Sequence, residues 1–207
     1  MSGTEGFISI EGIEGSGKST AAKFIAEYLK QKKYEVVLTA EPGGTPVGQK
    51  IRELLLEPQN HMDPVTELLL YYASRAQHVK DVISPALAEN KIVVTDRFTD
   101  STVAYQGYAR GLNMSIINSL DQIVVPYIKP QITFLLDLEV EEGLRRNRQA
   151  LKEDRFELEA VEFHRKVRVG FLEIAGQEPE RFKIIDASKS MEDVVNKIAG
   201  ILDKQWH

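Results

Sequence analysis

The chain has 207 residues, of which 43% are hydrophobic and 28% charged, which suits one globular domain with a single core and excludes a membrane-spanning protein. Its net charge of −5 excludes general binding to nucleic-acid backbones, which needs a surplus of Lys and Arg. Cysteine is absent, so a disulfide framework and a thiolate metal site are excluded as well. The apolar run at residues 7–10 is too short for a signal peptide, and we therefore expect a cytoplasmic protein.

Short apolar runs alternate with longer amphipathic stretches, which is typical of strands joined by crossover helices in a parallel sheet. The predicted strands cover residues 7–11, 35–39, 92–95, 132–136 and 182–185. The predicted helices cover residues 18–31, 46–56, 64–89, 115–125, 140–148, 155–176 and 191–204. Asp63 and Pro64 mark the start of the third helix, because a carboxylate caps free N–H groups and proline suits the first turn. The sequence thus predicts one α/β domain over residues 1–207, with a five-stranded parallel sheet flanked by helices.

A glycine-rich segment lies between the first strand and the first helix, and residues 12–19 match the phosphate-loop pattern G-x-x-x-x-G-K-[ST]. Its glycines let backbone N–H groups turn toward phosphate oxygens, and the helix N-terminus adds partial positive charge. Lys18 is expected to bridge the donor phosphates and Ser19 to hold Mg²⁺. Glycine-rich turns also occur for packing alone, but Lys and Ser in register favour nucleotide binding. The predicted ATP-binding residues are Gly12, Ile13, Glu14, Gly15, Ser16, Gly17, Lys18, Ser19 and Thr20.

Asp96 follows the predicted strand at residues 92–95, where a carboxylate can orient the metal or its waters. Many buried strands end in a turn-forming Asp, so Asp96 is a candidate metal ligand only because the phosphate loop is present. A phosphate loop alone fits GTPases, ATPases and small-molecule kinases. The guanine-reading pattern Asn-Lys-x-Asp begins at neither Asn90 nor Asn196, and this disfavours a GTPase.

Tyr71 and Arg75 are four residues apart in a predicted helix and therefore share one face. On that face the ring can stack on a base and the guanidinium can bond the edge of the base. A core tyrosine beside an arginine that reaches solvent has the same spacing, and spacing alone favours this second interpretation.

Four blocks of sequence occur in order, at residues 11–20 (EGIEGSGKST), 41–45 (EPGGT), 68–75 (LLLYYASR) and 96–107, which holds DRF, Ser101 and AYQG. Together they resemble the thymidylate kinase family, and the resemblance runs along nearly the whole chain. It implies a single-domain P-loop kinase with a short lid at about residues 145–156. It also implies transfer of the ATP γ-phosphoryl group to dTMP with Mg²⁺. By the same resemblance we expect a homodimer through helices such as those at 64–83 and 116–125, although half-buried core helices show the same pattern.

The resemblance also assigns residues to the acceptor nucleotide. Tyr71 would stack on thymine, and Arg75 would bond its exocyclic oxygen. The other implied contacts are Ser101 and Gln106 to the base, Tyr105 against the place of a ribose 2′-hydroxyl, and Glu14 to the sugar 3′-hydroxyl.

Further charged residues are candidates for the reacting phosphates. Arg97 can grip two oxygens of the acceptor phosphate, and the alternative is a surface ion pair. Glu41 ends the second predicted strand, where it is expected to bind a Mg²⁺ water or polarise the attacking phosphate, unless the segment is a plain turn. Ala40 stands where many relatives have arginine, so Arg52 is the candidate for a second cation at the acceptor.

Five basic residues lie within the eleven positions 145–155 of an otherwise acidic chain, and they are Arg145, Arg146, Arg148, Lys152 and Arg155. Some thymidylate kinases carry an arginine at the position of Gly15, and members without it resemble this chain in carrying lid arginines. Arg146 is expected to stack on adenine, and Arg148 and Arg155 to reach the transferring phosphoryl group. The alternative is a solvated helix face whose arginines pair with nearby glutamates, which are Glu141, Glu142 and Glu153.

Two rival functions share part of this pattern. A kinase for dUMP, CMP or AMP would have the same phosphate loop and lid. A nucleotide-binding regulator without an acceptor would use Tyr71 and Arg75 for packing.

Overall fold

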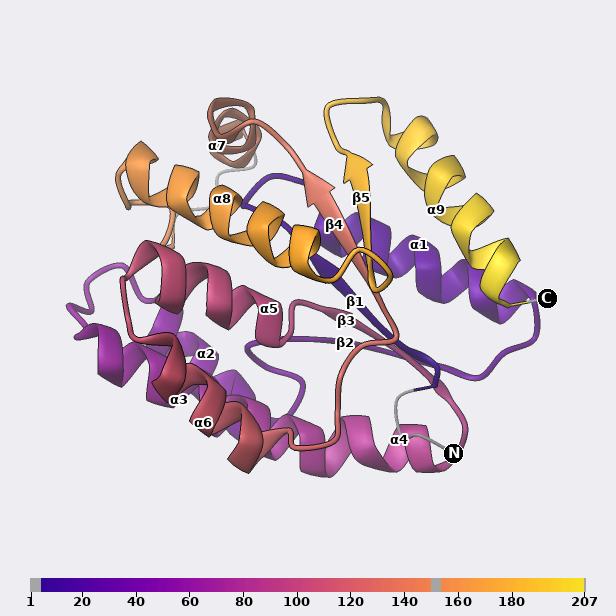
Figure 1. Ribbon diagram of the computed structural model, residues 1–207, viewed down its shortest axis with the longest axis horizontal. Coiled ribbons are helices and arrows are strands. Elements are labelled where there is room, and N and C mark those ends of the chain that lie inside the picture. Colours follow the sequence, from indigo (N-terminus) through magenta and orange to yellow (C-terminus); the bar gives the residue numbers. More distant parts are fainter. Residues whose placement is uncertain (1–4, 150–153, 207) are drawn as a thin grey trace.

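A computed structural model describes residues 5–149 and 154–206, and these contain one sheet of five parallel strands in the order β2-β3-β1-β4-β5 (Figure 1). The strands are β1 (Phe7–Glu11), β2 (Val36–Ala40), β3 (Ile92–Asp96), β4 (Ile132–Asp137) and β5 (Phe182–Asp186). Ile8 on β1 is in register with Val94 on β3 and with Ile132 on β4, so β1 is the central strand. The predicted parallel sheet is confirmed, with strand ends that differ by about one residue from the sequence pattern.

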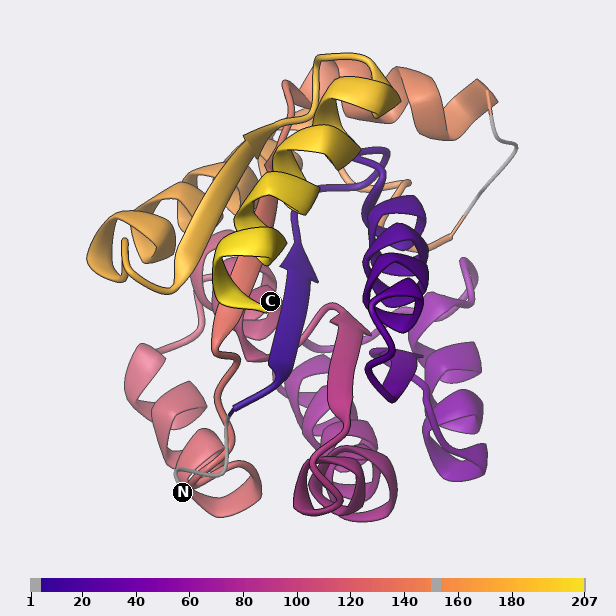
Figure 2. The same cartoon turned by 90° about the vertical axis from the view of Figure 1, so that its right-hand side faces the viewer.

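Helices cover both faces of the sheet. α1 (Lys18–Gln31) and α9 (Met191–Gln205) lie together on one face, while α8 (Val161–Gln177) packs against β4 and β5 on the other (Figure 1). Figure 2 shows α7 (Val140–Gln149) beyond the ends toward which the strands point. The remaining helical segments are α2 (Pro46–Leu56), α3 (Pro64–His78), η1 (Val79–Ile83), α4 (Ser84–Ala88), α5 (Thr99–Thr102), η2 (Val103–Ala109) and α6 (Met114–Val124).

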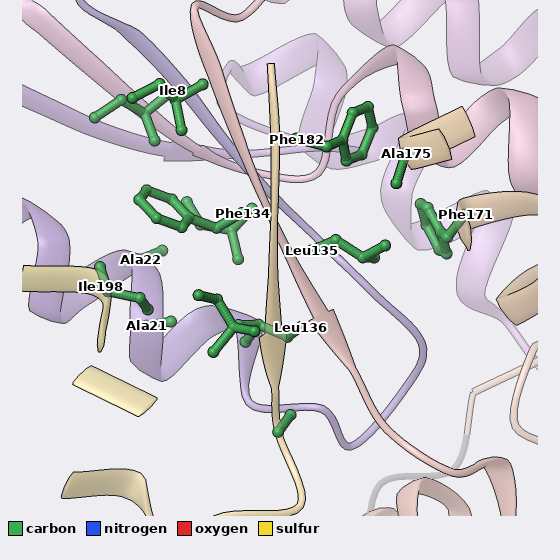
Figure 3. Packing of buried hydrophobic residues seen from close by; sticks show 14 of the residues in the cluster. Ile8, Ala21, Ala22, Phe134, Leu135, Leu136, Phe171, Ala175, Phe182 and Ile198 are labelled. Atoms are coloured by element: carbon green, nitrogen blue, oxygen red, sulfur yellow. The ribbon is translucent and has the colours of Figure 1, made fainter. Parts of the chain in front are cut away.

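The core forms on both sides of the sheet because the side chains of β4 alternate between its faces. In Figure 3, Phe134 points toward Ile198 of α9, whereas Leu135 points toward Phe171 of α8. With helices on both faces, every residue of β1 is buried, and so are all residues of β4 except Asp137. Strands buried on both faces are nearly continuous apolar runs, which is the signal that predicted them.

Three helical segments correct the prediction. The helix expected over residues 64–89 is interrupted by the π-helical turn η1, since Pro85 has no N–H to bond the carbonyl of Asp81. Residues 99–109, for which no helix was expected, form α5 and η2. The helix expected from residue 155 begins at Val161, because the Asp154 carboxylate accepts from the N–H of Phe156 at 2.9 Å and holds a turn there. No helix in the described parts of the chain is long and apolar enough to span a membrane.

Candidate active site

A cleft of about 600 Å³ opens where β1 and β3 end, beside the phosphate loop. The connection that leaves β1 runs toward β2 at one edge of the sheet, whereas the connection that leaves β3 runs toward β4 on the other side. The ends of β1 and β3 therefore form a topological switch point, which is the usual place for ligands in an open parallel sheet. The charged residues that line the cleft come from the phosphate loop, from the end of β3, from the segments that follow β2 and β3, from helices and from the turn before α8. They are Glu14, Lys18, Glu41, Arg52, Arg75, Asp96, Arg97, Arg146, Asp154 and Glu157.

The phosphate loop forms between β1 and α1, in the predicted place. Gly12 has a φ of 141°, and a Cβ there would lie 2.5 Å from the carbonyl oxygen of Leu136, so this position requires glycine. The Ser16 hydroxyl is buried and has no hydrogen-bond partner among the described residues. Lys18 Nζ donates to the carbonyl of Ile13 at 2.7 Å. An unused buried hydroxyl and an ammonium group held by a loop carbonyl fit a site for phosphate oxygens.

Gly15 of the phosphate loop contacts α7 directly. A Cβ on Gly15 would lie 2.1 Å from the carbonyl oxygen of Gly143, and a Cβ on Gly143 would lie 2.5 Å from the carbonyl oxygen of Glu14. No side chain fits at position 15 in this arrangement. Position 15 therefore contributes no side-chain charge to the cleft.

Lys18 has a pKa lowered to about 8. Burial is the largest cause, and Arg97 adds repulsion, while Asp96 and Glu14 act in the opposite direction. A polyphosphate beside the ammonium group would raise this pKa again, so ligand binding and protonation of Lys18 favour each other.

Ser19 and Asp96 meet at the edge of the cleft, where Ser19 Oγ donates to Asp96 Oδ2 at 2.5 Å. Ser19 lies in the first turn of α1, and Asp96 is the last residue of β3. Hydroxyl and carboxylate oxygens are ligands that Mg²⁺ prefers, and Mg²⁺ usually completes its shell with phosphate oxygens and waters. The two predicted metal-binding residues therefore fit a magnesium–nucleotide complex.

Arg97 joins the phosphate loop to the helical segment that follows β3. Its guanidinium donates to the carbonyl of Gly12 at 3.1 Å and to Ser101 Oγ at 3.0 Å. It also donates to the Tyr105 hydroxyl at 3.0 Å and to Glu14 Oε1 at 3.1 Å. Because the side chain is only 17% exposed and these partners surround the cleft, the interpretation of Arg97 as a surface ion pair is wrong.

Glu41 is bound at both carboxylate oxygens. Arg75 Nε donates to Oε2 at 2.8 Å, and His78 Nδ1 lies 2.9 Å from Oε1. Burial would raise the pKa of Glu41, but the Arg75 charge and the His78 contact outweigh burial and lower it. Glu41 thus lines the cleft as the partner of Arg75. His78, three residues after Arg75 on the same helix face, was not predicted, although that spacing could have indicated it.

Arg75 reaches the cleft rather than solvent. It is 1% exposed, and its Nη1 atom is buried without a hydrogen-bond partner in the described chain. The interpretation of Arg75 as an arginine that extends to solvent is therefore wrong. Tyr71 lines the same cleft, which agrees with the shared helix face that the spacing of the two residues indicated.

The other predicted acceptor residues also gather at the cleft. Ser101 donates to Glu11 Oε2 at 2.6 Å, and Gln106 donates to Glu67 Oε1 at 2.7 Å. Arg52 lies across the cleft, where its Nη1 donates to the carbonyl of Pro42 at 2.9 Å. The seven predicted acceptor residues other than Arg97 all line the cleft, and these are Glu14, Arg52, Tyr71, Arg75, Ser101, Tyr105 and Gln106.

The predicted lid arginines occupy different surroundings. Arg146 lines the cleft, bonded to Glu142 and to the carbonyl of Ala187. Arg148 is exposed on α7, and neither it nor Arg155 is among the described residues that line the cleft. Residues 150–153, which include Lys152 and the proposed pairing partner Glu153, lie outside the described residues.

Arg155 is 9% exposed and is held by residues of α2 and α3. Its Nε donates to the carbonyl of Leu55 at 2.9 Å. Its Nη2 lies 2.7 Å from Glu67 Oε2, close enough for an ion pair. Arg145 and Arg146 both pair with Glu142, as the alternative interpretation of this segment expected.

A phosphate loop that shares its cleft with a second group of side chains, made of arginines and tyrosines, can hold two nucleotides with their phosphates facing each other. The fold and this double site define a phosphate-loop nucleoside monophosphate kinase. A sequence model of the family described as thymidylate kinase matches residues 10–198. This chain belongs to the thymidylate kinase family.

Individual relatives agree with this assignment. The thymidylate kinase of Syntrophotalea carbinolica is 49% identical over 199 residues, which cover 93% of this chain and 92% of that protein. The thymidylate kinase of Geotalea uraniireducens is 50% identical over 194 residues, with coverage of 90% and 91%. A crystal structure of thymidylate kinase from Ehrlichia chaffeensis matches with a TM-score of 0.78 and 38% identity, over 95% of this chain and 97% of that one.

Proposed function

We propose that this protein transfers the γ-phosphoryl group of ATP to dTMP, giving dTDP and ADP. The observation that carries the proposal is Arg75, whose side chain lines the cleft together with that of Tyr71 and whose buried Nη1 lacks a hydrogen-bond partner in the described structure. A buried cationic donor without an acceptor is costly, and the exocyclic oxygen of a stacked thymine would satisfy it. The family to which the chain belongs supports the same acceptor.

In the proposed reaction a phosphate oxygen of dTMP attacks the γ-phosphorus, the bond to the bridging oxygen breaks, and ADP leaves with the electron pair. Lys18 and the loop N–H groups would bind the donor phosphates, and Arg97, with Arg52 opposite, would bind the acceptor phosphate. Ser19 and Asp96 would hold Mg²⁺, which neutralises phosphate charge when bound. No strong general base is required, because the attacking phosphate is already anionic.

Residues that bind the nucleoside complete the proposal. Tyr71 and Arg75 would bind the thymine, with Ser101 and Gln106 at its other edges. Tyr105 would exclude a ribose 2′-hydroxyl, and Glu14 would accept from the 3′-hydroxyl. Both substrates are nucleotides of the cell interior, so the same proposal gives the enzyme a cytoplasmic location.

The test compares acceptors. Purified protein with ATP and Mg²⁺ is supplied in turn with dTMP, dUMP, CMP and AMP, and ADP formation is followed. We expect the highest kcat/KM for dTMP. A preference for another monophosphate would identify a different kinase, and absence of heat on calorimetric titration with dTMP would favour a regulator without an acceptor.

Replacing Arg75 with methionine, which removes the charge but keeps much of the volume, should raise the KM for dTMP at least about tenfold. The KM for ATP should stay within about twofold, because Arg75 faces only the acceptor part of the cleft. The variant should also lose about 3–5 kcal/mol of unfolding free energy, since Glu41 stays buried without its cation.

The double variant Arg75→Met, Glu41→Gln separates the two effects of this change. It should recover stability, measured by denaturant unfolding, without recovering the KM for dTMP. If the two KM values rise together in the single variant, Arg75 does not bind the base.

We also propose that the lid contributes a catalytic arginine after it closes over ATP, because no side chain fits at Gly15 in this structure. Arg146 would then stack on adenine. Of Arg148→Ala and Arg155→Ala, at least one should lower kcat by about a hundredfold or more with little change in ATP affinity. Arg155→Ala should in addition lower the Tm, since Glu67 loses one of its buried partners.

Arg145→Ala is the matched control for the lid, because Arg145 is exposed and pairs with Glu142 on the same helix. If both variants and their double variant keep kcat within about threefold of the parent, the lid does not supply the cation. Arg52 is then the next candidate.

A homodimer belongs to the proposal as well. α3 and α6 contact each other, and they carry large exposed apolar side chains, namely Val65, Leu69, Ile116 and Ile123, the last of them 75% exposed. Such a surface suits burial against a second copy of the chain. Light scattering on the purified protein tests it, and a monomeric mass at assay concentrations would contradict it.

A further inference from the structure

A buried histidine of α8 contacts the phosphate loop. His164 is 1% exposed, and its Nδ1 lies 3.2 Å from Glu14 Oε2, although the two residues are 150 positions apart. α8 reaches this place because it packs closely on η2, where a Cβ at Gly170 would lie only 2.9 Å from the ring of Tyr108. The contact between His164 and the phosphate loop therefore depends on the docking of α8 against η2.

The carboxylate of Glu14 is held at both oxygens. Oε1 accepts from Arg97 Nη2 at 3.1 Å and from the Tyr105 hydroxyl, while Oε2 faces His164. Burial would raise the pKa of Glu14, but the His164 contact and the Arg97 charge outweigh burial and hold it well below its ordinary value. Glu14 is therefore an ionised group that can only accept hydrogen bonds.

Donors at one oxygen would not be enough to orient this carboxylate. The last side-chain torsion of glutamate is broad, so a carboxylate bonded only through Oε1 can rotate about it. A donor at Oε2 fixes the plane of the group and thus the direction of its remaining lone pairs. Glu14 lines the cleft, so these lone pairs are available to a ligand there.

We propose that His164 is a positioning residue that fixes the Glu14 carboxylate in the orientation needed to accept from the 3′-hydroxyl of the acceptor sugar. This inference rests on the proposed function, in which Glu14 accepts from that hydroxyl. It adds His164 as the residue that orients Glu14, and His164 lies on α8, outside the cleft lining.

The second ring nitrogen of His164 is consistent with this role. Nε2 is buried and has no hydrogen-bond partner within residues 5–149 and 154–206. A neutral ring with its proton on Nδ1 donates to Glu14 and leaves no N–H group unpaired, whereas the opposite tautomer would bury an unpaired N–H and face the carboxylate with a lone pair. The N–H donor to Glu14 is thus the feature to test, by one substitution that removes the donor and another that keeps it.

The experiment compares dTMP with 3′-deoxy-dTMP, which lacks the hydroxyl in question. His164→Phe keeps a ring but removes the donor, and His164→Gln keeps an N–H donor in a side chain of similar reach. We expect His164→Phe to raise the KM for dTMP about tenfold and to leave the KM for 3′-deoxy-dTMP within about twofold. His164→Gln should recover most of the loss. His61→Phe, a change at an exposed histidine, is the matched control.

Combination with Glu14→Gln provides an independent measurement. If His164 acts through Glu14, the double variant Glu14→Gln, His164→Phe should have the same KM for dTMP as Glu14→Gln alone, within about twofold. Additive effects would mean that His164 acts by another route. If His164→Phe does not fold, His164→Met also lacks a donor and adapts to an irregular buried site, so it serves in the same test.

The outcomes separate this inference from the proposed function. Parallel changes in KM for both acceptors, or failure of His164→Gln to restore the KM while the Tm is normal, would overturn the positioning role of His164. If the unaltered protein does not phosphorylate dTMP at all, the proposed function itself fails.

Discussion

Lys18→Ala is expected to abolish phosphoryl transfer, with kcat lowered by about a thousandfold or more. The side chain is 8% exposed in the phosphate loop, where its charge can act on the β- and γ-phosphates as they change. No other lysine lines the cleft among the described residues, and the nearby cation Arg97 is already bonded to four other groups. Steady-state kinetics with ATP and dTMP measures the effect.

Binding of dTMP should survive this change, because Lys18 makes none of the proposed contacts to dTMP. Calorimetry with dTMP alone should give an affinity within about threefold of the parent. Lys23→Ala, an exposed position on the same helix, is the control and should leave kcat unchanged. Near-normal turnover by Lys18→Ala would refute the assignment of the donor site.

Arg97→Lys is expected to lower kcat/KM for dTMP by about a hundredfold or more, even though it keeps the positive charge. The guanidinium of Arg97 bonds four groups of the cleft at once, and a lysine ammonium cannot reproduce this planar arrangement together with two-point binding of a phosphate. The affinity for ATP should change little, because Arg97 is assigned to the acceptor phosphate.

Arg165→Lys is the matched control, since Arg165 is exposed and pairs with Glu141 on the surface. It should have parental kinetics. If Arg97→Lys weakens ATP as much as dTMP, Arg97 belongs to the donor phosphates. If Arg97→Lys keeps kcat/KM for dTMP within about threefold, the acceptor phosphate is bound by another group, and Arg52 is the first candidate.

Much of the fold could be predicted because its signals are local. The inner strands β1, β3 and β4 are buried on both faces, so each of them is a short apolar run that the sequence displays directly. The phosphate loop is equally local, since the glycines and Lys18 act within eight consecutive positions. The helical segments at residues 99–109 were not predicted, because the sequence there shows no clear helical spacing of apolar residues. The π-helical turn η1 was not predicted either, because a helical pattern does not show how the chain accommodates Pro85.

The sequence by itself determined the α/β class, the phosphate loop and the pairing of Tyr71 with Arg75 on one helix face, because each depends on residues a few positions apart. Only the tertiary structure decided how charges are shared among distant segments. Glu41 is bound by residues 34 and 37 positions away, Arg155 by the carbonyl of a residue 100 positions away, and Glu14 by a histidine 150 positions away. These contacts form where crossover helices dock against the sheet, and docking depends on packing over the whole core, which no local pattern encodes.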